Sequence, residues 1–170
     1  MIDGIFNVLK PPGMTSHDVV SAMRKILGMK KIGHGGTLDP MAAGVLPVFA
    51  GKATRLLEYA VEGHKIYRAG ITFGEKTDTG DGAGRVIATS AVEHISQEVL
   101  TKTLSGFLGK SQQIPPMYSA LSYEGKKLYK LARDGVVVDR KPRDIYIYDL
   151  KQIAYKDTEL LIEVECSKGT

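Results

Sequence analysis

The sequence contains a single cysteine, no internal repeat and no long apolar run. One thiol, Cys166, cannot form an intrachain disulfide, and this usage suits a reducing compartment. No segment approaches the roughly 20 apolar residues that a membrane-spanning helix needs. The N-terminal segment places an acid before any base and lacks the apolar stretch of a signal peptide. We therefore expect a cytoplasmic protein that does not associate with a membrane.

Three familiar kinds of site are also missing from the sequence. The four histidines have no cysteine or glutamate at a close ligand spacing, so we expect no metal site. The glycines from Gly33 to Gly36 do not form a P-loop, because no Gly-Lys-Ser/Thr follows them. In Gly-Thr-Leu-Asp the aspartate follows the Gly-Thr pair, whereas in aspartyl-phosphate phosphatases it precedes that pair. The sequence therefore excludes both a P-loop and the active-site loop of an aspartyl-phosphate phosphatase.

The size and charge of the chain are those of an ordinary globular protein. Its 170 residues fit one domain, which at this size buries about 70% of the surface of the unfolded chain. The formal net charge of +4 permits a nucleic acid partner, although charge alone favours the simpler explanation of a slight excess of lysine. Basic side chains form three clusters, which favours a surface that follows a phosphate backbone. The clusters are Arg24, Lys25, Lys30 and Lys31; Lys126, Lys127 and Lys130; and Arg140, Lys141 and Arg143.

The hydrophobic pattern predicts an α+β (mixed α/β) fold with a largely antiparallel central sheet flanked by helices and loops. Short apolar or alternating segments predict strands at residues 4–9, 44–49, 65–74 and 85–91, and a hairpin of residues 145–155 and 160–166. Helical spacing and capping residues predict helices at residues 16–27, 52–61, 96–108 and 126–133. Ser16 and Ser96 are the expected N-caps, and residues 75–84 are expected to form a polar loop.

Asp39 is the most informative candidate for chemistry. It lies in a predicted loop, with Gly33, Gly35 and Gly36 before it and Pro40 directly after it. Glycine permits a positive φ or a close approach to a ligand, and proline holds the preceding residue extended. A carboxylate presented in this way can act as a nucleophile or as a general base. It can equally close the turn through a side-chain hydrogen bond, and the local pattern leaves both roles open.

Two aromatic rings are further candidates, each with a structural alternative. His34 can titrate near neutral pH or stack on a nucleobase, or it can be a loop residue without a role. Tyr67 lies in a predicted strand close to Lys65 and Arg68, an arrangement that lets a ring stack on a base while cations hold phosphates. Strand periodicity alone favours a core aromatic at this position.

Seven motifs of the chain, in the same order, resemble those of the bacterial tRNA pseudouridine-55 synthases, the TruB family. They begin at Lys10 (Lys-Pro-Pro-Gly-Met-Thr-Ser-His-Asp), Gly33 (Gly-His-Gly-Gly-Thr-Leu-Asp-Pro), Lys65 (Lys-Ile-Tyr-Arg), Thr77 (Thr-Asp-Thr-Gly-Asp), Ile114 (Ile-Pro-Pro-Met-Tyr-Ser-Ala), Gly125 (Gly-Lys-Lys-Leu-Tyr) and Cys166 (Cys-Ser-Lys-Gly-Thr). Each motif alone is weak evidence, whereas seven in family order are highly specific.

The resemblance implies a pseudouridine-synthase-like fold and a reaction that uses no metal or cofactor. The family converts one uridine in the T-loop of tRNA to pseudouridine after the base is flipped out. Asp39 aligns with the catalytic aspartate, Tyr67 with a tyrosine that stacks on the target base, and His34 with a histidine that stacks in the refolded T-loop. The resemblance does not decide whether the aspartate attacks C1′ or removes a ribose proton. The other residues expected to contact RNA are Lys10, Gly36, Thr37, Arg68, Asp81, Lys126 and Lys127.

The end of the sequence departs from the family pattern. In the family, Ser-Lys-Gly-Thr continues into Tyr-Ile-Arg and further segments, so residues 1–170 are expected to be the N-terminal part of a catalytic domain. The rest of that domain and a C-terminal RNA-binding domain are then absent, and we expect the isolated chain to be a monomer without turnover. The competing hypothesis is a non-catalytic RNA-binding module in which Asp39 is structural.

Overall fold

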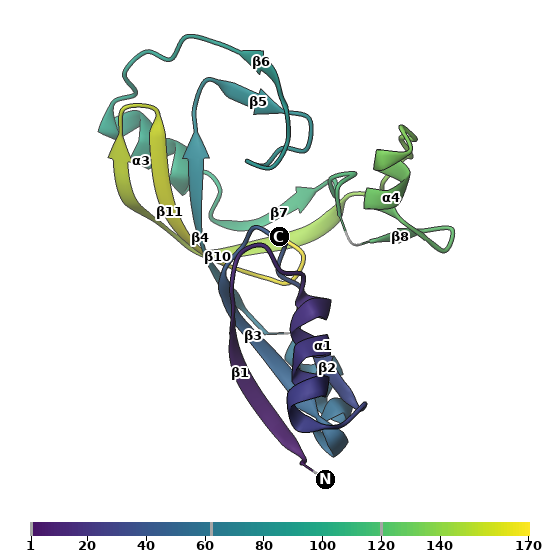
Figure 1. Cartoon of the computed structure of the whole chain (residues 1–170). Helices are drawn as coiled ribbons and strands as arrows, with labels where there is room; N and C mark the ends of the chain where they lie inside the picture. The colour runs from purple at the N-terminus through teal and green to yellow at the C-terminus, as the bar shows by residue number, and fades with distance from the viewer. Residues whose placement is uncertain (1, 62, 120) are drawn as a thin grey trace. The chain divides into compact units, whose positions relative to one another are not determined.

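Every strand pair among the described residues is antiparallel, and four helices accompany the strands, so the predicted α+β fold is confirmed. The computed structural model describes residues 2–61, 63–119 and 121–170 (Figure 1). Ala120, the last residue of the motif that begins at Ile114, lies outside these ranges. The chain divides into two compact units, Met1–Gly63 and His64–Thr170, which we call unit 1 and unit 2.

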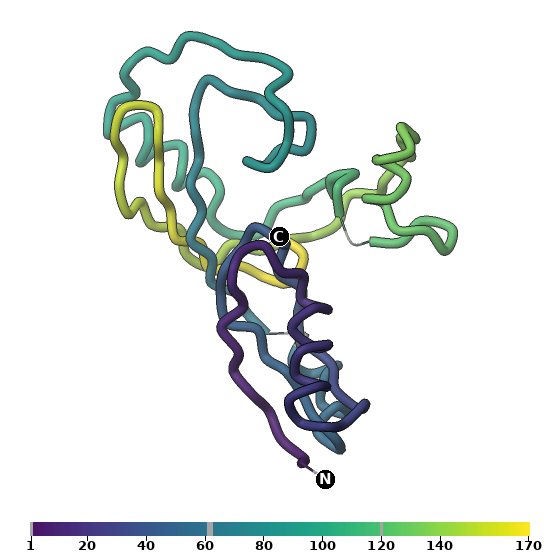
Figure 2. The backbone as a smooth tube through the Cα atoms, viewed as in Figure 1, coloured from purple at the N-terminus to yellow at the C-terminus, as the bar shows by residue number. Residues whose placement is uncertain are grey.

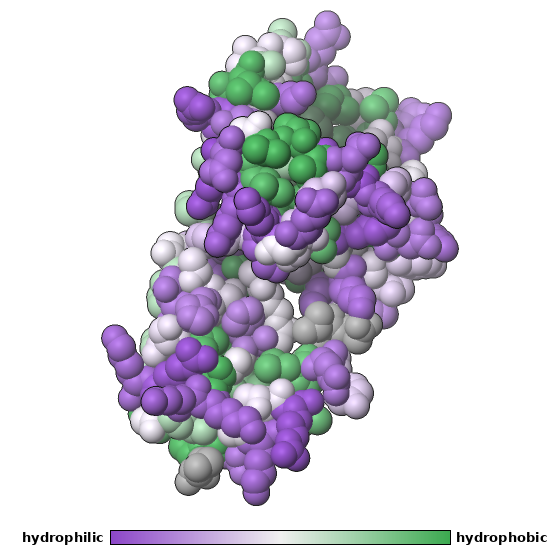
Figure 3. All heavy atoms as spheres, turned by 90° about the vertical axis from the view of Figure 1, so that its right-hand side faces the viewer, coloured by the Kyte–Doolittle hydropathy of each residue, from purple (hydrophilic) through white to green (hydrophobic). Residues whose placement is uncertain are grey.

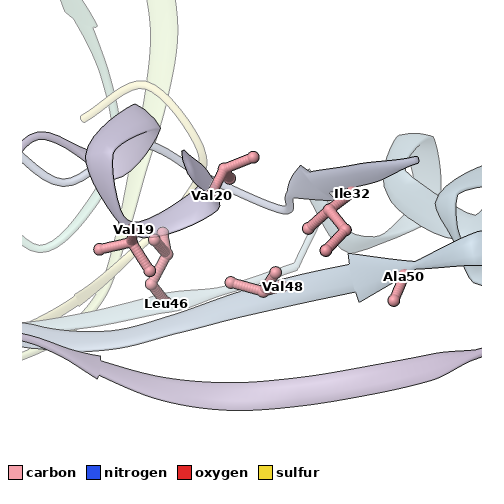
Figure 4. Packing of buried hydrophobic residues seen from close by; sticks show 6 residues of the cluster. All are labelled: Val19, Val20, Ile32, Leu46, Val48 and Ala50. Carbon is pink, nitrogen blue, oxygen red and sulfur yellow. The ribbon is translucent and has the colours of Figure 1, made fainter. Parts of the chain in front are cut away.

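Unit 1 is a three-stranded sheet with a helix on one face. The strand order is β1 (Gly4–Lys10), β3 (Gly44–Ala50) and β2 (Ile32–His34), and helix α1 spans Ser16–Leu27. The core lies between α1 and the sheet (Figure 4). Its buried members are Val19, Val20, Ile32, Leu46, Val48 and Ala50. After β3 the chain forms a 3-10 helix, η1 (Gly51–Leu56), and then the short helix α2 (Leu57–Val61), where the sequence predicted one continuous helix.

The ends of α1 are fixed by local chemistry. Thr15 is the N-cap, because its side chain accepts the N–H of Asp18 while Asp18 accepts the N–H of Thr15. The prediction that Ser16 caps this helix is therefore wrong, and Ser16 is its first helical residue. Gly28 ends the helix at a φ of 61°, a left-handed conformation that glycine adopts without strain.

Unit 2 is built on a four-stranded sheet in the order β4, β11, β10 and β7. These strands span Lys65–Thr72, Glu159–Cys166, Arg143–Lys156 and Gly109–Gln113, respectively. The long hairpin of β10 and β11 stands beside β4 in the backbone trace (Figure 2). The predicted hairpin is thus confirmed, and Asp157 takes a left-handed φ of 54° at its turn. Helix α3 (Gln97–Ser105) is capped by Ser96, as predicted.

Unit 2 also contains two small two-stranded ribbons, which differ from the loop and the helix that the sequence predicted there. Strand β5 (Glu75–Thr77) pairs with β6 (Val86–Thr89), so the predicted polar loop begins with a strand. Strand β8 (Ser122–Tyr123) pairs with β9 (Lys126–Lys127), and helix α4 spans only Leu128–Arg133. The predicted helix from Lys126 is therefore wrong in its first two residues. Strands β5, β7 and β9 are short and mostly polar, so they lack the alternation that reveals a half-buried strand.

Large apolar side chains remain at the surface of both units. Ile26 and Leu9 in unit 1 and Val137 in unit 2 are each about three-quarters exposed. Figure 3 shows one face of the molecule, on which hydrophobic side chains gather in patches among hydrophilic ones. Within the described ranges, none of the helices is long and apolar enough to cross a membrane.

Candidate functional site

Residues 35–43 connect β2 to β3, and we call this segment the aspartate loop. Asp39 lies at its centre, as predicted, and its side chain is exposed. The backbone carbonyl of Asp39 accepts the N–H of Ala42 at 3.0 Å. Within residues 2–61, 63–119 and 121–170, its carboxylate accepts no hydrogen bond and forms no ion pair. A structural role through a side-chain hydrogen bond would require such a partner.

Both neighbours of Asp39 are held by hydrogen bonds from the segment around the start of α1. The buried Ser16 hydroxyl donates to the Leu38 carbonyl at 3.1 Å and accepts the Leu38 N–H at 3.0 Å. On the other side of Asp39, the Pro40 carbonyl accepts the N–H of Gly13 at 2.7 Å. The backbone on each side of the carboxylate is therefore fixed by a partner more than 20 residues away in sequence.

Lys10 adds to this arrangement from β1. Its side chain is fully buried, at 0% exposure, although lysine is rarely buried. The ammonium donates to the carbonyls of Pro11 at 2.9 Å, Met14 at 2.7 Å and Pro40 at 3.3 Å. Three carbonyl acceptors compensate much of the cost of removing the charge from water. Lys10, which was expected among the RNA contacts, thus faces the protein backbone and ties the Pro-Pro-Gly turn to the aspartate loop.

Two of the three glycines before Asp39 serve close packing. Neither Gly33, Gly35 nor Gly36 has a positive φ. A Cβ on Gly33 would lie 2.9 Å from a Leu57 methyl, and one on Gly35 would lie 2.8 Å from the Phe49 ring. Gly36 has open space around the corresponding position, so its backbone is accessible to a ligand.

His34 and Thr37 flank these glycines. His34 is the last residue of β2 and is half-buried, so it lies on a strand where the sequence predicted a loop. Its Nδ1 is hydrogen-bonded to the Gly36 carbonyl, which fixes the ring beside the aspartate loop. Thr37 is exposed. Unit 1 therefore brings together Lys10, His34, Gly36, Thr37 and Asp39 around one loop.

Tyr67 lies in unit 2, in the middle of β4. Its cross-strand partner is Val164, so the ring shares a sheet face with the apolar residues of β11. The residue is partly exposed, at 39%. The next residue, Arg68, points to the opposite face, where its Nε donates to Glu163 at 2.9 Å.

The remaining predicted residues of unit 2 lie on its small ribbons. The carboxylate of Asp81 accepts the Thr79 hydroxyl at 2.7 Å and the Ala83 N–H at 2.9 Å, so it orders the turn between β5 and β6. Lys126 and Lys127 are exposed on β9. A hollow of about 440 Å³ lies between residues 77–80, 116–118 and 132–140 of this unit, and none of the predicted site residues lines it.

The candidate residues thus fall into two sets, one in each unit. The family resemblance implies that Asp39 and Tyr67 act on the same uridine, and this stays a prediction. Among the described residues, no group of three or more His, Cys, Asp or Glu side chains is placed to hold a metal ion. The roles of Ser16 and Gly13 could not be predicted from the sequence, because a Thr-Ser pair before a helix signals only a cap and Pro-Pro-Gly signals only a turn.

Comparison with known proteins points to one family. A sequence profile described as "TruB family pseudouridylate synthase (N terminal domain)" matches residues 24–170. A protein of Caldanaerobacter subterraneus subsp. tengcongensis named tRNA pseudouridine synthase B is 53% identical over 99% of this chain and 60% of its own length. The protein of that name from Symbiobacterium thermophilum is 51% identical over 99% of this chain and 58% of its own length. The chain therefore spans about three-fifths of the length of these relatives.

Solved structures with lower sequence identity also resemble this chain. A chain of the crystal structure titled "Cbf5-Nop10-Gar1 Complex" superimposes with a TM-score of 0.74 at 29% identity, over 98% of this chain and 40% of that one. A chain of an H/ACA RNP bound to a substrate RNA containing 2'-deoxyuridine superimposes with a TM-score of 0.67 at 26% identity, over 98% of this chain and 38% of that one.

Proposed function

Because the chain belongs to the TruB family of pseudouridylate synthases, we propose that the protein converts a uridine of tRNA to pseudouridine, at position 55 of the T-loop. The observation that supports this proposal most strongly is the setting of Asp39. Its exposed carboxylate has no partner within the described residues, while the backbone on both sides is fixed. A reactive group needs such freedom at the side chain and such order in the backbone.

The reaction is an isomerisation in which the uracil is detached and rejoined. The C1′–N1 bond breaks, the base turns, and C5 bonds to C1′. The proton lost from C5 is balanced by the proton that N1 gains, so no oxidant or reductant is required. Asp39 supports this chemistry either as a nucleophile at C1′ or as the base that removes a ribose proton.

The target base must leave the RNA stack, which costs a few kcal/mol. Stacking on an aromatic side chain returns about 1–3 kcal/mol per base. We assign this stacking to the partly exposed ring of Tyr67 for the target uracil. His34, whose ring is fixed beside the aspartate loop, is assigned to stack on a base of the refolded T-loop.

RNA binding is assigned to groups that can meet phosphates or sugars at the surface. Lys126, Lys127 and Arg68 provide exposed cations, and Gly36 and Thr37 provide accessible backbone beside Asp39. Asp81 contributes by ordering the turn that carries its motif. The burial of Lys10 argues for a supporting role in place of an RNA contact.

The test is a pseudouridine assay on the complete natural protein that carries this chain. A T-arm stem-loop RNA with C5-tritiated uridine at position 55 reports turnover by tritium release. We expect release with the wild type and none with Asp39→Asn. The RNA dissociation constant should not rise, because the two side chains have the same shape and asparagine removes a charge that repels phosphate. Asp139→Asn, at an exposed aspartate of unit 2, is the matched control.

The competing function, a non-catalytic RNA-binding module, predicts a different result. The wild type would then bind the stem-loop and release no tritium. A pure binding module gains nothing from an exposed carboxylate facing a polyanion, because the charges repel. Turnover by Asp39→Asn at the wild-type rate would instead remove Asp39 from the mechanism.

We further propose that the protein acts in the cytoplasm as a monomer and needs no metal or organic cofactor. The single cysteine and the family resemblance support this proposal. Light scattering of the purified protein measures its mass in solution. Turnover that persists after exhaustive treatment with a chelator would support the cofactor-free reaction, and loss restored by a divalent metal would contradict it.

A further inference from the structure

Ser16 makes a pair of contacts that helix formation does not require. Thr15 already caps α1, and the Ser16 side chain is only 3% exposed. Burying a hydroxyl is unfavourable unless it is hydrogen-bonded. Both partners of the hydroxyl are on Leu38, 22 residues further along the chain. The hydroxyl donates to the Leu38 carbonyl at 3.1 Å and accepts the Leu38 N–H at 3.0 Å. The hydroxyl therefore closes a small ring with the backbone of one residue.

The residue that Ser16 binds lies directly before Asp39. Leu38 also packs its side chain against the core of unit 1, so its backbone and its side chain are both fixed. On the other side, Pro40 has a restricted φ and its carbonyl accepts from Gly13 and Lys10. Asp39 is thus an exposed residue whose neighbours on both sides have a fixed backbone.

From this geometry we infer that Ser16 is a positioning residue for Asp39, acting through the backbone of Leu38. The inference rests on the proposed function, since it assigns Asp39 to the reaction. A displacement of about 1 Å at a reacting group can cost about 100-fold in rate. Loss of the hydroxyl should therefore slow the chemical step while leaving RNA binding largely intact.

Three substitutions separate hydrogen bonding from volume. Ser16→Ala removes the hydroxyl, Ser16→Cys keeps the approximate volume with a much weaker donor and acceptor, and Ser16→Thr keeps the hydroxyl. Ser21→Ala is the matched control, because Ser21 lies on the same helix and is half-buried. All variants are made in the complete natural protein and compared by circular dichroism to establish that they fold.

Three measurements are made on each variant. Single-turnover tritium release from the T-arm stem-loop gives the rate of the chemical step, and titration of the same RNA gives its dissociation constant. Amide hydrogen exchange at Leu38 reports the Ser16 contact directly, without activity. We expect Ser16→Ala and Ser16→Cys to lower the rate about 10- to 100-fold. The dissociation constant should change less than about threefold, and Leu38 exchange should be at least about tenfold faster.

The variants also define the results that overturn the inference. Ser16→Thr and Ser21→Ala should stay within about threefold of the wild type. Wild-type rates for Ser16→Ala would overturn the inference, as would rates for Ser16→Cys equal to those of the wild type. Equal losses of rate and RNA affinity would show a general structural role instead. If the wild type itself forms no pseudouridine, the proposed function fails, and unchanged Leu38 exchange in Ser16→Ala would then refute the contact independently.

Discussion

Asp39 and Tyr67 are presented by different kinds of backbone. Asp39 lies in an irregular loop of unit 1, and its neighbours are fixed by the side chains of Ser16 and Lys10 and by the Gly13 N–H. Tyr67 lies in the middle of β4, where the ladder to β11 continues over the whole strand. The position of Asp39 depends on a few individual side chains, whereas the position of Tyr67 depends on main-chain hydrogen bonds.

This difference has a mechanical consequence. A ladder of main-chain hydrogen bonds survives the replacement of one side chain by that of any residue other than proline, because all these residues contribute the same main-chain groups. A loop held by buried side chains loses its order when one of them is replaced, and an acceptor left without a partner costs about 1–3 kcal/mol. Unit 1 should therefore be sensitive to conservative changes around Asp39, while unit 2 should tolerate changes beside Tyr67.

The largest effect is expected from Lys10→Met, which keeps the length of the side chain and removes its donors. Pro11 and Met14 lose the contacts that Lys10 makes to their carbonyls, so unit 1 should be destabilised by about 1–3 kcal/mol. Urea unfolding followed by circular dichroism measures this loss. Lys25→Met, at an exposed lysine of α1, is the control and should change the stability by less than about 0.5 kcal/mol.

The same variant distinguishes a supporting role of Lys10 from an RNA contact. A lysine that pairs with a phosphate would reduce the salt dependence of RNA binding by about one unit of slope when it is replaced. Because Lys10 is buried, we expect the slope to be unchanged in Lys10→Met. A lower slope with unchanged stability would restore the original expectation for this residue.

The next effect concerns the glycines before Asp39. A Cβ on Gly35 would lie 2.8 Å from the Phe49 ring and 3.1 Å from the Ala60 side chain, so Gly35→Ala should destabilise unit 1 by about 1–3 kcal/mol. Gly36→Ala is a close control, because nothing lies within 4 Å of its added methyl. Equal stabilities of the two variants, measured by urea unfolding, would show that the packing around Gly35 is loose.

The sequence predicted the parts of the fold in which hydrophobic pattern and burial coincide. The hairpin of β10 and β11 has alternating residues, and Leu160 and Cys166 are buried on one face as that alternation requires. Strands β5, β7 and β9 escaped prediction because their polar residues are mostly exposed in short ribbons or at a sheet edge. In such strands, pairing is decided by neighbours that are distant in the sequence.

The candidate site likewise has features that the local sequence predicts and features that depend on distant residues. The glycines and Pro40 were sufficient to predict an ordered loop that presents Asp39. The burial of Lys10 could not be predicted, because it depends on Pro40, which lies 30 positions further along the chain. The choice of Thr15 over Ser16 as the cap likewise depends on which residue takes extended backbone angles, and two adjacent hydroxyls leave that choice open.

A smaller, pH-dependent effect is expected at the start of α1. Hydrogen bonds from the Thr15 side chain and backbone lower the pKa of Asp18 from its ordinary value of 3.8. A lowered folded-state pKa means that the contribution to stability is fully present above the unfolded-state pKa. It is lost as the pH falls through the folded-state value.

Asp18→Asn should therefore be less stable than the wild type at pH 6, and the difference should shrink as the pH falls below about 4. Thermal unfolding at several pH values measures this, with the exposed Asp139→Asn as the control. A difference that grows on acidification would contradict the sign of the shift.

The smallest effect is expected beside Tyr67. Arg68 lies opposite Glu163 on the neighbouring strand and donates to it at 2.9 Å, but its side chain is 70% exposed. Exposed ion pairs contribute about 0.2–1 kcal/mol and are screened by salt. Arg68→Gln should thus lower the stability of unit 2 by less than about 1 kcal/mol, and a double-mutant cycle with Glu163→Gln isolates the pair. The coupling should fade in about 1 M salt. A coupling above about 2 kcal/mol that persists in salt would show that the position of Tyr67 also depends on one side chain, and the contrast between the two units would then fail.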